Sequence, residues 1–156
     1  MRMLLCRHGE AVSRAPTDAE RTLTKRGIEA LQRHWLGLKE DGIGVNMLVA
    51  SPYVRAQQTA AVIAQVYGLE EWSTCPDLVP DADPQAFLDW LIAQPAQPGQ
   101  AFISHMPFVS SLTARWTGAG ASRFAFDVGG VAHLDVEVAA AEGARLIWLR
   151  NPAHSH

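Results

Sequence analysis

The chain has 156 residues, 48% of them hydrophobic and 19% charged, and its formal net charge is −3. This length and composition are typical of one folded domain with a single core, and we expect residues 1–156 to form that domain. A weakly acidic chain without a basic cluster argues against nucleic-acid binding. No apolar run approaches the roughly 18 residues that a membrane-spanning helix needs.

The cysteines and the N-terminus argue against secreted and metal-binding classes. Cys6 and Cys75 have neither the spacing of a disulfide framework nor that of a zinc site. The segment before Arg7 is too short for the apolar region of a signal peptide. We therefore expect a cytoplasmic protein that uses no metal and no cofactor, and we expect the polar tail at 153–156 to be frayed.

Short apolar runs and helical repeats alternate over the first two-thirds of the chain. Residues 3–6 predict a buried strand, and the polar stretch 11–23 predicts a loop. Thr24 is the expected N-cap of a helix whose apolar residues recur at helical spacing up to Asp41. A second strand is expected at 45–50.

The next predicted helix begins at Ser51-Pro52, with Ser51 as its N-cap and Pro52 in its first turn. It should end at Tyr67 because Gly68 follows. The remaining elements up to residue 122 are a loop at 70–84, a helix at 84–94, a strand at 101–103, a helix at 107–117 and a turn at 118–122.

The last third of the chain changes to strands joined by short turns, predicted at 123–128, 131–138 and 144–149. His133 lies on the polar face of the middle one, where an exposed position is expected, although its side chain could approach a ligand-binding rim. Strand–helix repeats followed by hairpins predict an α/β fold with a mixed, mostly parallel central sheet flanked by helices.

Three polar residues occupy equivalent places in this pattern. His8 follows the first strand, Arg55 lies in the first helical turn after the second strand, and His105 follows the third. Ligands of open α/β sheets bind beyond the carboxyl ends of the strands, so we expect these side chains to converge on one rim. A cation is poorly placed at a helix start unless an anion binds there, which favours a phosphate site at Arg55.

Such a cluster is suited to phosphoryl transfer through a covalent intermediate. A neutral imidazole can attack phosphorus, while guanidinium groups bind the phosphoryl oxygens and a second histidine donates to them. Nearby arginines should lower the pKa of His8 and keep it neutral. Water would then hydrolyse the phosphohistidine.

The chain also resembles a known family. The segments 7–10 (Arg-His-Gly-Glu), 51–59 and 103–105 (Ile-Ser-His) are similar to the three signature segments of the histidine phosphatase superfamily, in the same order and over almost the whole chain. The resemblance implies a three-layer α/β/α sandwich. It also implies that His8 is the nucleophile.

The resemblance assigns further roles. It implies that Arg7 and Arg55 bind phosphate and that His105 stabilises the transferred group. The segment 21–27 resembles the Arg-x-Leu-Thr-x-x-Gly segment of the SixA-type phosphohistidine phosphatases, which suggests that Arg21 binds substrate. An ordinary surface arginine is the alternative for this residue.

The chain departs from the family pattern in the residue that would act as general acid. Related mutases use a glutamate after the second signature segment, and here the carboxylates in that region are Glu70, Glu71, Asp77, Asp81 and Asp83. We choose Asp77 as the candidate acid. A phosphorylated imidazole is a better leaving group than an alkoxide and needs less help from an acid.

The leading hypothesis is therefore a monomeric phosphatase that removes phosphate from a histidine of a signalling or phosphotransfer protein. The short stretch between the second helix and the third strand leaves little room for a lid, which suits a protein substrate. The alternatives are a small-molecule phosphomonoesterase of the same superfamily and a non-catalytic phosphate-binding module.

Overall fold

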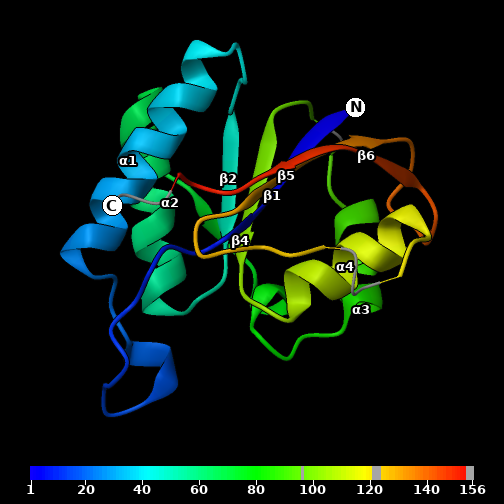
Figure 1. Ribbon diagram of the computed structural model, residues 1–156. Coiled ribbons are helices and arrows are strands. Elements are labelled where there is room, and N and C mark those ends of the chain that lie inside the picture. The colour runs from blue at the N-terminus through cyan, green and yellow to red at the C-terminus, as the bar shows by residue number, and fades with distance from the viewer. Residues whose placement is uncertain (96, 121–123, 154–156) are drawn as a thin grey trace.

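The computed structural model describes residues 1–95, 97–120 and 124–153 (Figure 1). The strands are β1 (Arg2–Arg7), β2 (Met47–Ala50), β3 (Ser73–Thr74), β4 (Gln100–Ser104), β5 (Val131–Val136) and β6 (Ala144–Arg150). The helices are α1 (Lys25–Glu40), α2 (Val54–Tyr67), α3 (Pro84–Ile92) and α4 (Phe108–Thr117), with 3-10 turns η1 (Asp18–Glu20) and η2 (Pro76–Leu78). None of the helices described is long and apolar enough to cross a membrane.

The strands form one six-stranded sheet in the order β3-β2-β4-β1-β5-β6. The four strands from β3 to β1 run parallel, whereas β5 and β6 run antiparallel to their neighbours. Helices α1 and α2 cover one face of the sheet, and α3 and α4 cover the other (Figure 1). The predicted mixed, mostly parallel α/β/α sandwich is confirmed.

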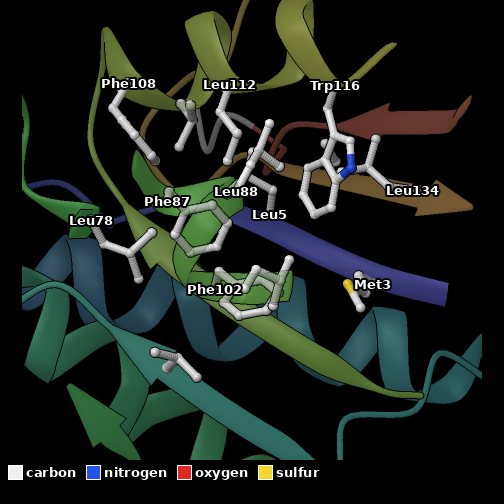
Figure 2. Packing of buried hydrophobic residues seen from close by; sticks show 14 of the residues in the cluster. Met3, Leu5, Leu78, Phe87, Leu88, Phe102, Phe108, Leu112, Trp116 and Leu134 are labelled. Atoms are coloured by element: carbon white, nitrogen blue, oxygen red, sulfur yellow. The ribbon is translucent and has the colours of Figure 1, made fainter. Parts of the chain in front are cut away.

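Alternation along the central strands gives each face its own core. In β1, Leu4 packs toward α1 and α2, and Leu5 packs toward α3 and α4. The core on the α3 and α4 side is largely aromatic, and Figure 2 shows Phe87, Phe102 and Trp116 within it. Helices cover both faces of the central strands. Polar side chains can therefore gather in the loops that follow the carboxyl ends of these strands.

The structure corrects the predicted start of the second helix. Helix α2 begins at Val54, and its N-cap is Tyr53 rather than Ser51. The backbone N–H of Ser51 still bonds to the Ile103 carbonyl, so the chain remains extended beyond β2. The Ser51 hydroxyl instead accepts a hydrogen bond from the N–H of Tyr53 at 3.3 Å.

The stretch 70–84 is mostly loop, as expected, and contains the two-residue strand β3 and the turn η2. One other prediction needs correction. Residues 124–128 are not a strand, because side chains bind their backbone: the Phe126 carbonyl accepts from Arg7. The expectations for 121–123 and for the tail at 154–156 fall outside the residues that the structure describes.

Candidate active site

The carboxyl ends of β1, β2 and β4 form the rim on which the predicted residues meet. The backbone N–H of His8 donates to the Ser104 carbonyl at 3.0 Å, and that of Ser51 donates to the Ile103 carbonyl at 3.0 Å. Parallel pairing therefore continues past the strand ends and brings the loops after all three strands together. His105 follows directly, so the expected convergence of the strand ends is observed.

The loop after His8 packs closely against α1 and α2. The N–H of Gly9 donates to the Thr59 hydroxyl at 3.1 Å, and the N–H of Thr24 donates to the Glu10 carbonyl at 3.0 Å. A Cβ on Gly27 would collide with the backbone of Glu10, which explains a glycine at this position of the helix. These contacts fix the loop that carries His8.

His8 has a defined tautomer. Its Nδ1 lies 2.7 Å from the Gly9 carbonyl oxygen, and its Nε2 lies 3.2 Å from Nε of Arg55. A carbonyl can only accept and a guanidinium can only donate, so Nδ1 carries the proton and Nε2 presents its lone pair. The nitrogen that would attack phosphorus is thus unprotonated and lies against an arginine.

The surroundings keep His8 neutral. Burial, together with the charges of Arg55, Arg7 and Arg21, lowers the pKa of His8 to about 4 against the opposing effect of the hydrogen bond to Gly9. An imidazolium has no lone pair to attack with, so a lowered pKa preserves a nucleophile at neutral pH.

This lowered pKa predicts a loss of stability in mild acid. The unfolded chain binds a proton on His8 below pH 6.5, but the folded chain does so only below about 4, so the free energy of unfolding falls as the pH drops. Between pH 7 and pH 5 the contribution of His8 is about 2 kcal/mol. Denaturant unfolding of wild type and His8→Asn at both pH values measures it. Equal pH dependence in the two proteins would contradict a neutral His8.

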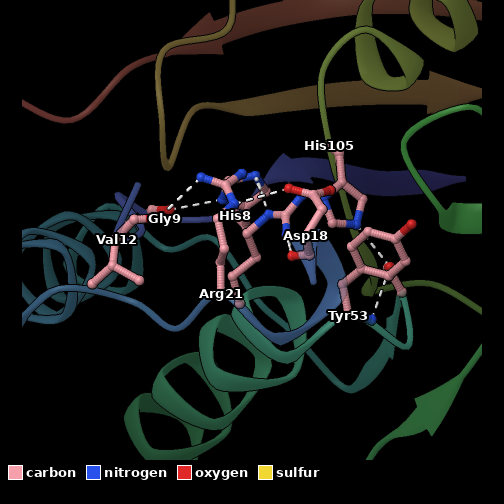
Figure 3. Close-up of polar contacts among 9 residues, drawn as sticks. His8, Gly9, Val12, Asp18, Arg21, Tyr53 and His105 are labelled. Carbon is pink, nitrogen blue, oxygen red and sulfur yellow. Dashed lines mark hydrogen bonds and ion pairs between the residues drawn. The ribbon is translucent and has the colours of Figure 1, made fainter. Parts of the chain in front are cut away.

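Arg55 is buried, with 3% of its surface exposed, and each of its three guanidinium nitrogens donates to a partner from this chain. Nε donates to His8, Nη1 donates to the carbonyl oxygen of Asp18 at 2.6 Å, and Nη2 donates to Oδ2 of Asp18 at 3.1 Å. The guanidinium also lies over the ring of Tyr53, 5.0 Å from its centroid. Figure 3 shows Asp18 in the same region as His8, Tyr53 and His105.

His105 lies beside His8, with a distance of 5.0 Å between the two ring centroids. Its Nε2 is 2.7 Å from the Ser51 hydroxyl, and the Tyr53 ring packs edge-on against it. Burial, with the neighbouring His8 and Arg55 acting in the same direction, lowers the pKa of His105 to about 3. The structure therefore places a second neutral imidazole next to the candidate nucleophile.

The two other predicted arginines lie at the edge of this cluster. Nη1 of Arg7 donates to the Phe126 carbonyl at 2.8 Å, and burial lowers the pKa of Arg7 while Asp127 raises it. Arg21 donates from Nε to Oδ1 of Asp18 at 2.9 Å. The charges of both arginines act on His8.

Two candidates are not joined to the cluster. Asp77 lies in η2 beside Leu78, whose carbonyl accepts a hydrogen bond from Ser104. Within the described residues no hydrogen bond or ion pair connects the Asp77 carboxylate to His8 or Arg55, and its role stays a prediction. His133 lies opposite Leu4 in the middle of the sheet, half-buried and away from the rim.

Sequence reasoning missed Asp18, and it missed Ser51 and Tyr53 as partners of His105. Asp18 is three residues before Arg21, a spacing at which side chains can pair, but no sequence pattern connects it to Arg55. No group of three or more His, Cys, Asp or Glu in the described chain could hold a metal ion. The cluster offers guanidinium groups that can bind an oxyanion, next to an unprotonated imidazole nitrogen.

Comparisons with known proteins agree with this chemistry. A profile of the histidine phosphatase superfamily (branch 1) matches residues 3–79. The chain is 30% identical over 128 residues to a phosphohistidine phosphatase SixA homologue from Haemophilus influenzae. The aligned residues cover 76% of this chain and 78% of the relative. It is also 30% identical over 120 residues to the phosphohistidine phosphatase SixA from Escherichia coli, and these residues cover 73% of each chain.

A solved structure supports the same assignment. The structure of the protein histidine phosphatase SixA complexed with tungstate matches this fold with a TM-score of 0.82 and 25% identity, over 96% of both chains. The chain therefore belongs to the histidine phosphatase superfamily, in its SixA branch, and is an enzyme of the hydrolase class.

Proposed function

We propose that this enzyme removes the phosphoryl group from phosphohistidine on a signalling or phosphotransfer protein, with His8 as the covalent carrier. The observation that carries the proposal is the unprotonated Nε2 of His8, which accepts a hydrogen bond from Nε of Arg55 at 3.2 Å. Nucleophile and oxyanion ligand are thus adjacent, as in-line attack on a phosphoryl group requires.

The reaction has two steps. His8 Nε2 attacks phosphorus, the bond from phosphorus to the substrate imidazole breaks, and the released imidazole takes up a proton. Water then attacks the phosphorus of phosphorylated His8, which releases inorganic phosphate and restores the imidazole. Arg7 and Arg55 bind the phosphoryl oxygens in both steps, and His105 stabilises the group being transferred.

Three observations support phosphohistidine as the substrate. The relatives from Haemophilus influenzae and Escherichia coli are phosphohistidine phosphatases. Between α2 and β4 the described chain contains one helix, α3, which packs on the core and leaves no large cover for a small substrate. A phosphorylated imidazole leaves without strong acid assistance, and Asp77 on η2 is our candidate for the remaining proton transfer.

We place the reaction in the cytoplasm and expect a monomer, since a site that must dock a protein has to stay accessible. The deciding experiment offers the enzyme a phosphotransfer protein labelled on histidine and, in parallel, a panel of small phosphate esters. We expect fast loss of label from the protein and slow turnover of the esters. Strong turnover of one ester, with no loss of label from phosphohistidine, would make this a small-molecule phosphatase.

A further inference from the structure

The loop between β1 and α1 covers the outer side of Arg55. Asp18, the first residue of η1, accepts hydrogen bonds on its backbone oxygen from Nη1 and on its carboxylate from Nη2. With Nε bonded to His8, each nitrogen of the guanidinium has a partner from this chain. Asp18 therefore occupies the outer side of the guanidinium, and a phosphoryl group that approaches Arg55 from solvent meets this residue first.

The geometry of the guanidinium shows where a phosphoryl group would meet Asp18. Nε and Nη2 lie on the same edge of this planar group. Nε donates to the attacking nitrogen of His8, and Nη2 donates to Oδ2 of Asp18. When His8 attacks phosphorus its lone pair leaves Nε, and the phosphoryl group brings its oxygens to these same two nitrogens. The Asp18 carboxylate is thus an anion that already uses a nitrogen that the phosphoryl group needs.

Burial supports the same conclusion. His8 is 6% exposed and Arg55 is 3% exposed, whereas the Asp18 side chain is 58% exposed. A reacting phosphorus must come within about 3–3.5 Å of its nucleophile. Because Asp18 forms the outer layer over buried Arg55, its carboxylate has to leave before phosphorus can reach His8.

Arg21 holds this arrangement in place. Its Nε donates to Oδ1 of Asp18 at 2.9 Å, and its Nη1 donates to the Val12 carbonyl at 3.0 Å (Figure 3). Partial desolvation raises the pKa of Asp18, but the hydrogen bonds from Arg55 and Arg21 outweigh it and leave that pKa below the usual range. At neutral pH the group is a carboxylate held by two arginines.

We propose that Asp18 competes with phosphoryl groups for Arg55 and so limits inhibition by the phosphate product. The inference rests on the proposed function in that it takes His8 and Arg55 as the phosphoryl site. Every ligand must displace the same carboxylate, so the cost falls on the phosphoryl group whatever is attached to it. Inorganic phosphate has no other contacts to offset that cost, so the released product binds weakly.

Titration calorimetry with inorganic phosphate tests the competition directly, without any turnover. We expect Asp18→Asn to bind phosphate about 10-fold more tightly than wild type, since a charge-assisted hydrogen bond is worth on the order of a tenfold change in an equilibrium constant. The matched control is Glu20→Gln. Glu20 lies on the same turn and carries the same charge, but its carboxylate bonds to Thr17 and not to Arg55. Its phosphate affinity should equal that of wild type.

A second measurement tests product inhibition. The inhibition constant of inorganic phosphate against turnover of a phosphohistidine protein should fall about 10-fold in Asp18→Asn and in Asp18→Ala. Phosphate binding that is unchanged or weaker in both variants would overturn the proposal and leave Asp18 as a support for Arg55. If phosphohistidine turnover fails but Asp18→Asn still binds phosphate more tightly, the competition stands and only the proposed substrate is wrong.

Discussion

Replacing His8 by alanine is expected to abolish both turnover and the covalent intermediate. Alanine removes Nε2, the nitrogen that presents a lone pair beside Arg55. Without it, water must attack the substrate directly, and the reaction loses its two-step path. We expect a fall in kcat of roughly 10⁴-fold or more, the range seen when a covalent nucleophile is removed. The measurement is steady-state turnover together with acid-labile label trapped on the protein.

The control for this variant is His133→Ala. His133 is also a partly buried histidine with a pKa lowered by burial, but it lies opposite Leu4 in mid-sheet and packs on the Trp148 ring. Its loss should leave kcat within a few-fold of wild type. Wild-type turnover by His8→Ala, or label that persists on that variant, would exclude His8 as the phosphoryl carrier.

The parts of the site that follow from the order of strands could be predicted from the sequence. Buried parallel strands end at one edge of a sheet, so polar residues that follow three such strands must meet there. His8, Arg55 and His105 satisfy this rule, and the structure brings them together. No detail of side-chain packing was needed, because the topology alone fixes their proximity.

Predictions from local sequence were wrong where a residue's polar groups form hydrogen bonds with residues far away in the chain. Ser51 has the side chain of an N-cap, but its hydroxyl lies 2.7 Å from His105 and the helix starts later. Residues 124–128 have the composition of a strand, yet Asn151 binds the N–H of Asp127 and the Ala125 carbonyl. Backbone groups that are satisfied by distant side chains cannot be recognised from local sequence.

Asp18 shows the same limit within the site. The loop at 11–23 contains several charged residues, and nothing in its sequence indicates which of them turns toward the sheet. Only the packing of η1 against α2 brings the Asp18 carboxylate to Arg55. Position relative to the strand ends predicts which residues line the rim, but loop conformation determines what covers it.

Arg55→Lys is expected to lower kcat/KM by about 10²–10³-fold, as for the loss of other donors that act in a transition state. Lysine keeps the positive charge but has a single nitrogen in place of the planar fork. It cannot present two parallel N–H groups to two oxygens of one phosphoryl group, as the edge of Arg55 that carries Nε and Nη2 can. Kinetics with a phosphohistidine protein at saturating and limiting concentrations measure the loss.

The matched control is Arg26→Lys, since Arg26 donates from the same pair of nitrogens, Nε and Nη2, to a carboxylate outside the site. Its Nε and Nη2 donate to the two oxygens of Glu10 at 3.0 and 2.8 Å, and its side chain is 75% exposed. An exposed ion pair contributes little, so Arg26→Lys should retain both stability and activity. If the two variants lose activity equally, the fork geometry of Arg55 has no special role.

The intermediate gives Arg55→Lys a second readout. Formation and hydrolysis of the phosphoenzyme pass through similar charge on the same phosphoryl oxygens, so one guanidinium should assist both steps. Both rates should therefore fall together, and the fraction of His8 trapped as phosphohistidine should stay near the wild-type value. A large rise in that fraction would mean that Arg55 acts mainly on hydrolysis. In that case its contact with His8 Nε2 in the free protein would orient the nucleophile without stabilising the transferred group.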